Sequence, residues 1–248
     1  MPGLRVIQSL SAGVDWLLPH VPQGVIVCRA VGVHDRPVSE WILAVILAAQ
    51  RRLPAFIEFQ RLATWDRSVI DETAVDLEDQ TVVVVGYGSI GRTLASRLVP
   101  FGVRVIGVAR RARDGAQPTS ALPDLLPQAD VVVNLLPLTS GTAGFVDAAF
   151  LKQMKPDALF INAGRGKTVD TPALLEALKS GHVRAALDVT DPEPLPDGHP
   201  LWHAPNVLIT PHVAGSTARW RSRGYIFAAE QIRRYVAGQP LLGVETQP

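Results

Sequence analysis

The sequence predicts an α/β protein, in which a doubly wound parallel sheet with helices on both faces is joined to a smaller α/β unit. Two features of the 248 residues lead to this fold class. Short runs of Val, Ile and Leu are apolar throughout instead of alternating, which is typical of strands covered on both faces. Patterns with helical spacing lie between these runs, and strands that alternate with helices indicate a parallel sheet.

The strand-like runs are bounded by Gly, Pro or Asp, which favour turns. In chain order these runs are 5–10, 24–30, 81–86, 103–108, 130–136, 158–163, 184–189 and 206–210. Helical patterns lie between the later runs, at 89–99, 146–153 and 171–179. Ser180-Gly181 follows the last of them and predicts its end.

Two longer helices are predicted outside this alternating region. The first begins near Pro37 and Ser39 and runs to about Leu53, because Pro54 favours a break. The second covers about 216–237, and its apolar residues share one face: Trp220, Ile226, Ala229, Ile232 and Val236.

The acidic stretch 70–80 contains no apolar run and is interpreted as a connection between two units. Residues 77–213 are predicted to form the unit with the doubly wound sheet. The flanks, 1–76 and 214–248, are predicted to pack together as a second, discontinuous unit.

The composition excludes several classes of protein. A net charge of +1 gives no general attraction to nucleic acid, and the longest apolar run, 41–49, is too short to span a membrane. The single cysteine, Cys28, cannot form an intramolecular disulfide, which favours the cytoplasm. Hydrophobic residues make up 47% of the chain, which is sufficient for a packed core.

A glycine motif follows the strand-like run at 81–85. The segment GYGSIG (86–91) has the G-x-G-x-x-G spacing of a Rossmann dinucleotide site. Gly86 suits the tight turn, Gly88 the close approach of a pyrophosphate, and Gly91 the packing of helix on strand. Ser89 and Ile90, with Gly91, begin a helix whose free N–H groups favour phosphate. The alternative is a glycine-rich turn that binds nothing.

The next strand, 103–108, ends where an NAD site carries Asp or Glu for the ribose 2′-hydroxyl. This chain has Ala109 there, followed by Arg110, Arg111 and Arg113. Alanine cannot accept a hydrogen bond, whereas arginine can hold a 2′-phosphate through several donors. The sequence therefore predicts that NADP(H) is preferred over NAD(H). The alternative is a solvated basic loop.

Three later segments each follow a strand-like run and carry one reactive side chain. They are INAGRG (161–166) with Arg165, DVTDPEPLP (188–196) with Glu193, and LITPHVAGS (208–216) with His212. Ligands of doubly wound sheets bind outside the carboxyl ends of the strands, so these side chains are expected to converge. Together with GYGSIG and SAGVD (11–15), the segments resemble the D-isomer-specific 2-hydroxyacid dehydrogenases, which include glyoxylate and hydroxypyruvate reductases. The resemblance extends over nearly the whole chain.

The resemblance implies three catalytic residues, and their chemistry agrees with it. Arg165 would hold the substrate carboxylate and polarise the 2-oxo group, and His212 would protonate the carbonyl oxygen. Glu193 would hydrogen-bond His212 and favour the imidazolium. Formate dehydrogenases carry Gln in place of Glu193, which favours a 2-oxo acid over formate. Taken singly, the three are ordinary residues of ion pairs and loops.

The resemblance also implies binding residues and partners. The backbone N–H groups of Ala12, Gly13 and Val14 would help to bind the substrate carboxylate, and Asp188 would contact the nicotinamide amide. The smaller unit would be flavodoxin-like, and the protein would be a homodimer in which the helix containing 41–49 borders the interface.

The expected function is therefore hydride transfer between NADP(H) and a small 2-oxo or 2-hydroxy acid such as glyoxylate or hydroxypyruvate. A second hypothesis is a non-catalytic, nicotinamide-nucleotide-sensing protein, because the same family includes transcriptional corepressors. No metal site is expected, since His199 and His203 lack a further ligand cluster.

The chain departs from the family at its beginning. The family has several βα units before the stretch that matches 5–15, so roughly 60–80 residues of typical βα length are missing. The smaller unit would keep two strands of five, and its sheet should have an exposed edge and an uncovered apolar face. A start site assigned too late, a shortened chain and a partner that covers the gap remain as explanations.

Overall fold

The computed structural model describes residues 3–68, 70, 74–112 and 115–245. Its main body is a seven-stranded sheet with the strand order β5-β4-β3-β6-β7-β8-β9, and all neighbouring strands are parallel. The strands are β3 (Thr81–Val85), β4 (Arg104–Ala109), β5 (Gln117–Pro118), β6 (Val131–Asn134), β7 (Ala158–Asn162), β8 (Val183–Leu187) and β9 (Val207–Ile209). The first strand of the sheet, β3, lies inside it, and the chain winds outward in both directions. This is the predicted Rossmann order.

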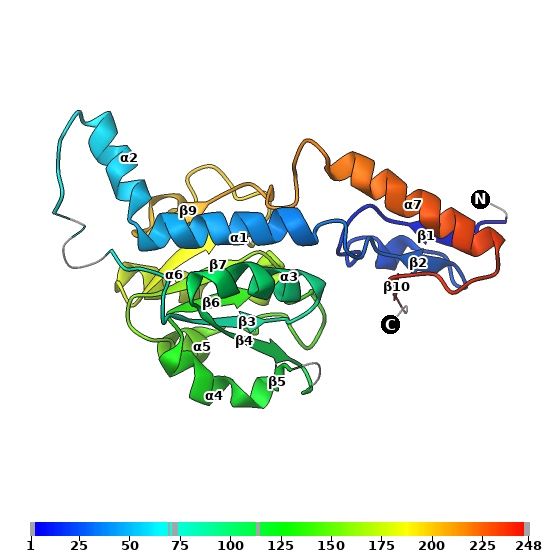
Figure 1. Cartoon of the computed structure of the whole chain (residues 1–248), viewed down its shortest axis with the longest axis horizontal. Coiled ribbons are helices and arrows are strands. Elements are labelled where there is room, and N and C mark those ends of the chain that lie inside the picture. Colours follow the sequence, from blue (N-terminus) through cyan, green and yellow to red (C-terminus); the bar gives the residue numbers. More distant parts are fainter. Residues whose placement is uncertain (1–2, 69, 71–73, 113–114, 246–248) are drawn as a thin grey trace.

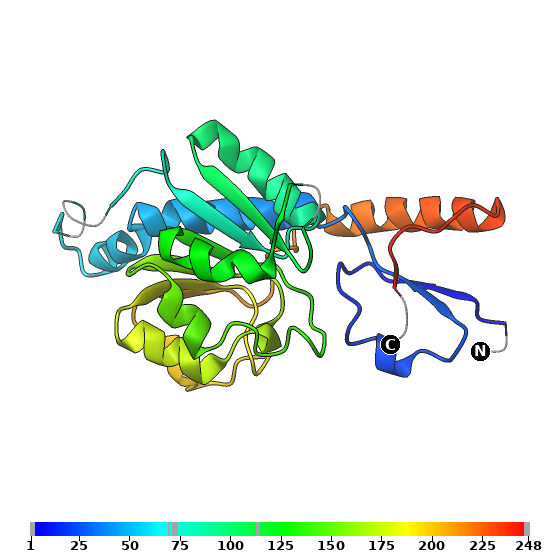
Figure 2. The ribbon, with the colours of Figure 1, turned by 90° about the horizontal axis from the view of Figure 1, so that it is seen from below.

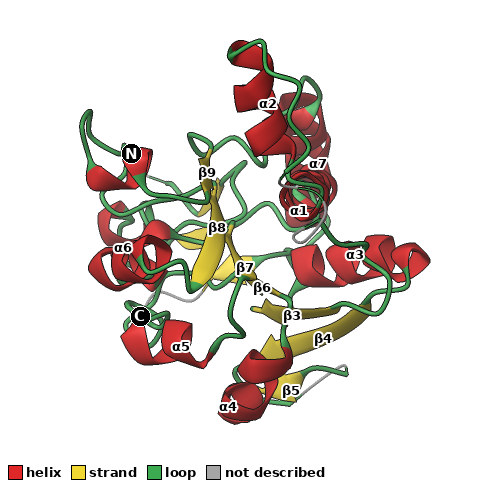
Figure 3. Cartoon of the chain, turned by 90° about the vertical axis from the view of Figure 1, so that its left-hand side faces the viewer, coloured by secondary structure: helices red, strands yellow, loops and turns green. Residues whose placement is uncertain are grey.

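Helices cover both faces of the large sheet (Figure 3). On one face lie α1 (Asp35–Gln50) and α3 (Ser89–Leu98), and on the other α4 (Leu122–Leu125), α5 (Ala148–Gln153) and α6 (Thr171–Lys179). Alternate residues of each strand point to opposite faces, so β3 contributes side chains to the hydrophobic core on each face of the sheet. Val82 and Val84 pack with Ile42 of α1, whereas Val83 and Val85 belong to the core on the other side.

A smaller sheet lies beside this body (Figures 1 and 2). Its strands are β1 (Val6–Gln8), β2 (Ile26–Cys28) and β10 (Val244–Glu245). β1 is parallel to β2, and β10 is antiparallel to it. The prediction of two strands is therefore corrected to three. β10 was missed because two residues form no recognisable strand pattern.

The C-terminal helix α7 (Trp220–Val236) packs on the small sheet and is shorter than predicted. Residues 216–219 instead form turns, in which Ser216 N donates to Val213 O and Trp220 N to Thr217 O. The buried Gln231 holds the helix by donating to Gln8 Oε1 at 2.9 Å and to Leu242 O at 2.8 Å.

The predicted apolar face of α7 points away from the small sheet. Ile226, Ile232 and Val236 are 71%, 65% and 81% exposed, and Val244 of β10 is also exposed. α7 thus presents an uncovered apolar face next to this sheet, whereas an uncovered apolar face of the sheet itself stays a prediction. β1 is also an edge strand among the described residues, as expected.

The first long helix is divided, because Arg52 adopts a left-handed φ of 53° just before α2 (Leu53–Arg61). α1 packs on the large sheet although it comes from the predicted flanking unit; the division into 1–76 plus 214–248 and 77–213 stays a prediction.

The buried Arg184 of β8 holds the end of α1 by donating to Ala49 O at 3.1 Å and Gln50 Oε1 at 2.8 Å. Desolvation lowers the pKa of Arg184, and Asp157 opposes that shift.

Short 3-10 helices complete the fold: Leu18–His20, Val99–Phe101, Thr119–Ala121, Leu126–Gln128, Gly166–Thr168 and Pro200–His203. Within the described ranges, no helix has the length and apolar character needed to cross a bilayer.

Candidate active site

The glycine turn lies between β3 and α3 and has the geometry of a dinucleotide site. Gly86 has a φ of 95°, and a Cβ on it would lie 2.7 Å from the carbonyl carbon of Leu135. A Cβ on Gly88 would meet nothing closer than Gly86 O at 4.0 Å, so the space above this residue is open. Any larger residue at Gly86 would therefore clash, whereas Gly88 leaves room for a bulky group.

The N-terminus of α3 opens into that space. Gly88 is its N-cap, and no side chain caps the helix. The first-turn N–H groups of Ser89, Ile90 and Gly91 have no partner within the helix, which is the arrangement that binds a pyrophosphate. Ser89 Oγ donates to Asp35 Oδ1 at 3.1 Å, which links the turn to the start of α1. The residues present fit a dinucleotide.

Arg110 and Arg111 come directly after β4 and are both exposed. β4 is the neighbour of β3, so these charges stand at the same edge of the sheet as the glycine turn. Arg113 lies outside the described residues. The structure shows two exposed arginines directly after β4, and their contact with the adenosine ribose and the NADP(H) preference stay predictions.

The loop that carries Arg165 rests on buried amides. Asn134, at the end of β6, donates to Asn162 Oδ1 at 3.1 Å and to Thr168 Oγ1 at 2.7 Å. Asn162 donates to Arg165 O at 3.2 Å, and Thr168 to the same oxygen at 2.6 Å. Asn134, Asn162 and Thr168 are at most 1% exposed. The backbone at Arg165 is therefore fixed by a satisfied polar network in a dry environment.

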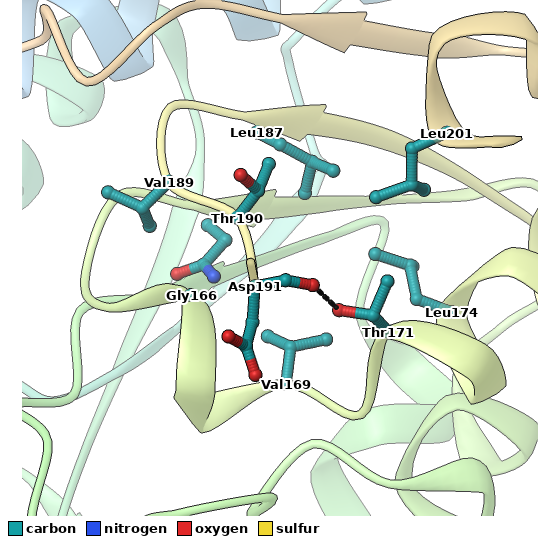
Figure 4. A pocket seen from close by; sticks show the side chains of 10 residues that line it. Gly166, Val169, Thr171, Leu174, Leu187, Val189, Thr190, Asp191 and Leu201 are labelled. Carbon is teal, nitrogen blue, oxygen red and sulfur yellow. Dashed lines mark hydrogen bonds between the residues drawn. The ribbon is translucent and has the colours of Figure 1, made fainter. Parts of the chain in front are cut away.

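The Arg165 loop also packs against the loop that leads to Glu193. A Cβ on Gly166 would lie 1.8 Å from Thr190 O, so only glycine permits this approach. Thr171 Oγ1 donates to Asp191 O at 2.8 Å from the neighbouring helix. Figure 4 shows these residues around a small cavity between the two loops, lined on its far side by Leu187 and other apolar side chains.

Glu193 and His212 meet at the surface, as the sequence predicts. His212 Nδ1 lies 2.5 Å from Glu193 Oε1, and both side chains are substantially exposed. His212 has a left-handed φ of 55°, which costs on the order of 1 kcal/mol for a residue other than glycine. A backbone held in such a conformation is typical of a functional position.

Asp188, 3% exposed, provides the support for that conformation. Its carboxylate accepts hydrogen bonds from Thr210 Oγ1 at 2.6 Å, Val213 N at 2.8 Å and Ala214 N at 2.9 Å. Its carbonyl oxygen accepts one from His212 N at 2.8 Å. The contact of Asp188 with the nicotinamide amide, implied by resemblance, stays a prediction; the structure shows that Asp188 builds the turn at His212.

The loop after β1 approaches from the small sheet. Within the described part of the chain, the backbone N–H groups of Ala12, Gly13 and Val14 make no hydrogen bond. Arg165 reaches this loop, where its Nε donates to Asp15 Oδ1 at 2.9 Å. The loop at 12–14 and the Arg165 guanidinium thus lie against each other, and their binding of a substrate carboxylate stays a prediction.

β7, β8 and β9 are neighbours in the sheet, so Arg165, Glu193 and His212 all follow its carboxyl edge, on the side of the glycine turn. The described residues contain no cluster of three His, Cys, Asp or Glu that could hold a metal ion. The described residues thus bring together at this edge an arginine, a carboxylate-backed imidazole and a glycine turn at a helix N-terminus.

Residues 43–214 match the family model of the D-isomer specific 2-hydroxyacid dehydrogenase NAD-binding domain. The chain belongs to the D-isomer specific 2-hydroxyacid dehydrogenase family. The predictions of this family, of the Rossmann fold and of the class of enzyme are thereby confirmed.

Members of known name are similar over almost the whole chain. A human glyoxylate reductase/hydroxypyruvate reductase is 35% identical over 96% of the chain and 76% of its own length. An NADPH-dependent glyoxylate/hydroxypyruvate reductase from Sinorhizobium meliloti, in complex with NADP and sulfate, superposes with a TM-score of 0.88 at 33% identity, over 99% of this chain and 80% of that one. A D-3-phosphoglycerate dehydrogenase from Mycobacterium bovis is 38% identical over 96% of the chain. The chain spans 46% of the length of that relative.

Sequence reasoning missed the residues that support the site. Asn134 and Asn162 are polar residues at strand ends, Thr168 lies in a loop segment of the sequence, and Asp15 is separated from Arg165 by 150 positions. One signal was present: a polar residue that ends an otherwise apolar buried run needs a partner, because an unpaired buried amide is costly.

Proposed function

We propose that the protein reduces a small 2-oxo acid of the glyoxylate or hydroxypyruvate type with NADPH, and oxidises the corresponding 2-hydroxy acid with NADP in reverse. The observation that carries this proposal is the contact of His212 Nδ1 with Glu193 Oε1, at the same sheet edge as Arg165 and the glycine turn. A carboxylate behind an imidazole is suited to moving one proton.

Each residue has one task in the proposed reaction. Arg165 and the free N–H groups at 12–14 bind the substrate carboxylate, which places the 2-oxo carbon for reaction. NADP(H), when bound, supplies or accepts the hydride. Because Glu193 engages Nδ1 of His212, Nε2 is the nitrogen that gives the proton to the carbonyl oxygen. Glu193 stabilises the charged ring, so the proton is available when the hydride reaches carbon.

The proposal is tested by measuring NADPH consumption at 340 nm with glyoxylate, hydroxypyruvate and a bulkier 2-oxo acid. Turnover of the two small acids with slower turnover of the bulky acid is the expected result. Binding of NADPH without turnover of any 2-oxo acid would instead favour the sensing hypothesis. The reductases and dehydrogenase named above support catalysis over sensing.

The cofactor preference for NADP(H) rests on Arg110 and Arg111. Both are exposed at the end of β4, and neither has a carboxylate beside it in the sequence to hold a ribose hydroxyl. NADPH and NADH are titrated while nucleotide fluorescence is followed. NADPH should bind at least about tenfold more tightly, since charge-assisted contacts contribute roughly 1.5–3 kcal/mol each. Changing both arginines to alanine should remove the difference; tighter binding of NADH by the unchanged protein would contradict the preference.

The protein is further proposed to be a homodimer located in the cytoplasm. The single, buried Cys28 supports a reducing compartment. α2 projects from the body (Figure 1). Exposed apolar side chains lie on α2 and on the segment directly after it: Leu53, Ile57, Leu62 and Trp65. Such a surface is typical of an interface. Light scattering should give twice the chain mass, and changing Ile57 and Trp65 to glutamate should give a monomer.

A further inference from the structure

Asp15 joins the small sheet to the reactive arginine of the large one. Its Oδ1 accepts a hydrogen bond from Arg165 Nε at 2.9 Å, and about a quarter of each side chain is exposed. Partly buried ion pairs with direct hydrogen bonds are geometrically specific, unlike most surface pairs. The position of the Arg165 guanidinium therefore depends on a residue of the loop after β1.

The contacts of the guanidinium leave one side of it available. Arginine has five N–H donors in a rigid fork. Asp15 takes the one on Nε, and Gly164 O takes one from Nη1 at 2.9 Å. Nη2 lies over Gly13, where a Cβ would be only 1.5 Å from it. Nη2 thus lies against the loop whose backbone N–H groups at 12–14 make no hydrogen bond to any described residue.

We propose that Asp15 is a positioning residue for substrate binding, which holds Arg165 by its Nε so that Nη2 stays over Gly13 to receive the substrate carboxylate. This inference rests on the proposed function and adds a residue to it. Two effects of Asp15 oppose each other. Its negative charge repels a substrate carboxylate, while its hydrogen bond orients the group that binds that carboxylate.

Two variants separate these effects. Asp15→Asn removes the charge but keeps an oxygen that can accept from Nε. Asp15→Ala removes both. If orientation dominates, Asp15→Ala should raise KM for hydroxypyruvate by about 10- to 100-fold, the range expected for losing one charge-assisted hydrogen bond, and Asp15→Asn should restore most of the loss. The Kd of NADPH should change less than about twofold in both variants, because Asp15 is on the substrate side.

Glu40→Gln is the matched control. Glu40 forms an ion pair of similar length with Arg97 Nη1, at 3.0 Å between α1 and α3, but it is more exposed than Asp15 and lies away from Arg165. Its kinetics should equal those of the unchanged protein. Asp15→Ala kinetics equal to the control would overturn the inference. If Asp15→Asn raises KM as much as Asp15→Ala does, the inference is overturned as well. The negative charge of Asp15, and not its hydrogen bond to Nε, would then determine KM.

Oxalate binding to the NADP-loaded protein gives a readout that needs no turnover. The unchanged 248-residue chain should bind oxalate, a planar dicarboxylate analogue of the substrate, and Asp15→Ala should weaken this binding by the same factor as it raises KM. If the unchanged protein binds no oxalate and reduces no 2-oxo acid, the proposed function fails, and the role of Asp15 with it. If it does both and Asp15→Ala matches the Glu40→Gln control, only the role of Asp15 fails.

Discussion

The two sheets of this protein differ most in how well their strands are covered. The central strands of the large sheet, such as β3 and β6, are buried along their whole length, and Val83 and Val132 have no exposed surface. In the small sheet every residue of β1 is half-buried, and Ile26 and Val244 are 41% and 50% exposed. The proposed catalytic side chains all follow strands of the better covered sheet.

This difference separates two requirements of the site. The chemistry needs positions held within a fraction of an ångström, and the large sheet supplies them through buried bonds at Asn162 and Asp188. The proposed donors for the substrate carboxylate come from both regions, since Arg165 follows the large sheet and the N–H groups at 12–14 lie on the loop after β1. Polar contacts connect the regions, namely Arg165 with Asp15 and His34 Nε2 with Leu10 O at 2.8 Å.

The largest expected effect tests whether the large sheet carries the chemistry. His212→Asn should lower kcat by about 10²- to 10⁴-fold, because it removes the proton donor, and should leave the Kd of NADPH unchanged. His203→Asn, on an exposed 3-10 helix, is the control and should keep full activity. Equal loss of kcat and of cofactor affinity would contradict the assigned role.

The contrast in burial predicts a contrast in stability. Phe160→Ala, in the core of the large sheet, should lower the free energy of unfolding by about 3–5 kcal/mol. Ile26→Ala, in the small sheet, should lower it by less than about 1 kcal/mol, because the side chain is already partly exposed. Urea unfolding followed by circular dichroism measures both. Similar losses would show that the two sheets are equally important for folding.

A change in the buried amide network should make activity depend on pH in a new way. In Asn162→Asp the new carboxyl can donate to Arg165 O only while protonated, and burial raises the pKa of a carboxyl. The kcat/KM ratio of this variant should therefore fall, on the order of tenfold, as pH rises through that raised pKa. The step should appear in the ratio of kcat/KM for the variant to kcat/KM for the unchanged protein, measured in the same buffers, because that ratio removes the pH dependence that the two share. An identical pH profile for both would mean that the network does not hold Arg165.

The smallest expected effect is a change in the rate at which Cys28 reacts with a thiol reagent, which reports local opening of the small sheet. Burial raises the pKa of the Cys28 thiol, so little thiolate exists in the folded state. Labelling with a thiol reagent should be slow in native protein, and should accelerate at urea concentrations that leave the circular dichroism of the large sheet unchanged. Labelling that begins only with global unfolding would show that both sheets open together.

The sequence located the strands of three or more residues in both sheets, β1 and β2 included, to within about two residues, and it missed the two-residue strand of each sheet. Strands buried on both faces are apolar throughout, so β3, β6 and β7 were located to within about two residues. β5 and β10, with two residues each, have no such pattern, and β5 contains Pro118. The direction of the apolar face of α7 was also beyond the sequence, because helical spacing shows that a face exists but not what covers it.

For the site, the sequence predicted which side chains come to the same edge of the sheet but not what holds them, and their catalytic roles stay a proposal. Arg165, Glu193 and His212 were recognisable because each follows a strand in a specific motif, and the contact of Glu193 with His212 agrees with that reading. Asp15 could not be assigned in the same way, because its role depends on a contact across 150 positions between two sheets.

The approach of Gly166 to Thr190 O has a consequence for protein engineering. The segments that carry Arg165 and Glu193 pack so closely that Gly166 has no room for a methyl group. The conformation of each segment therefore depends on that of the other. Exchanging one of them with a homologue, in order to change the preferred acid, would bring in a backbone shaped for a different neighbour. Libraries for altered specificity should therefore vary 163–168 and 189–193 as a matched pair.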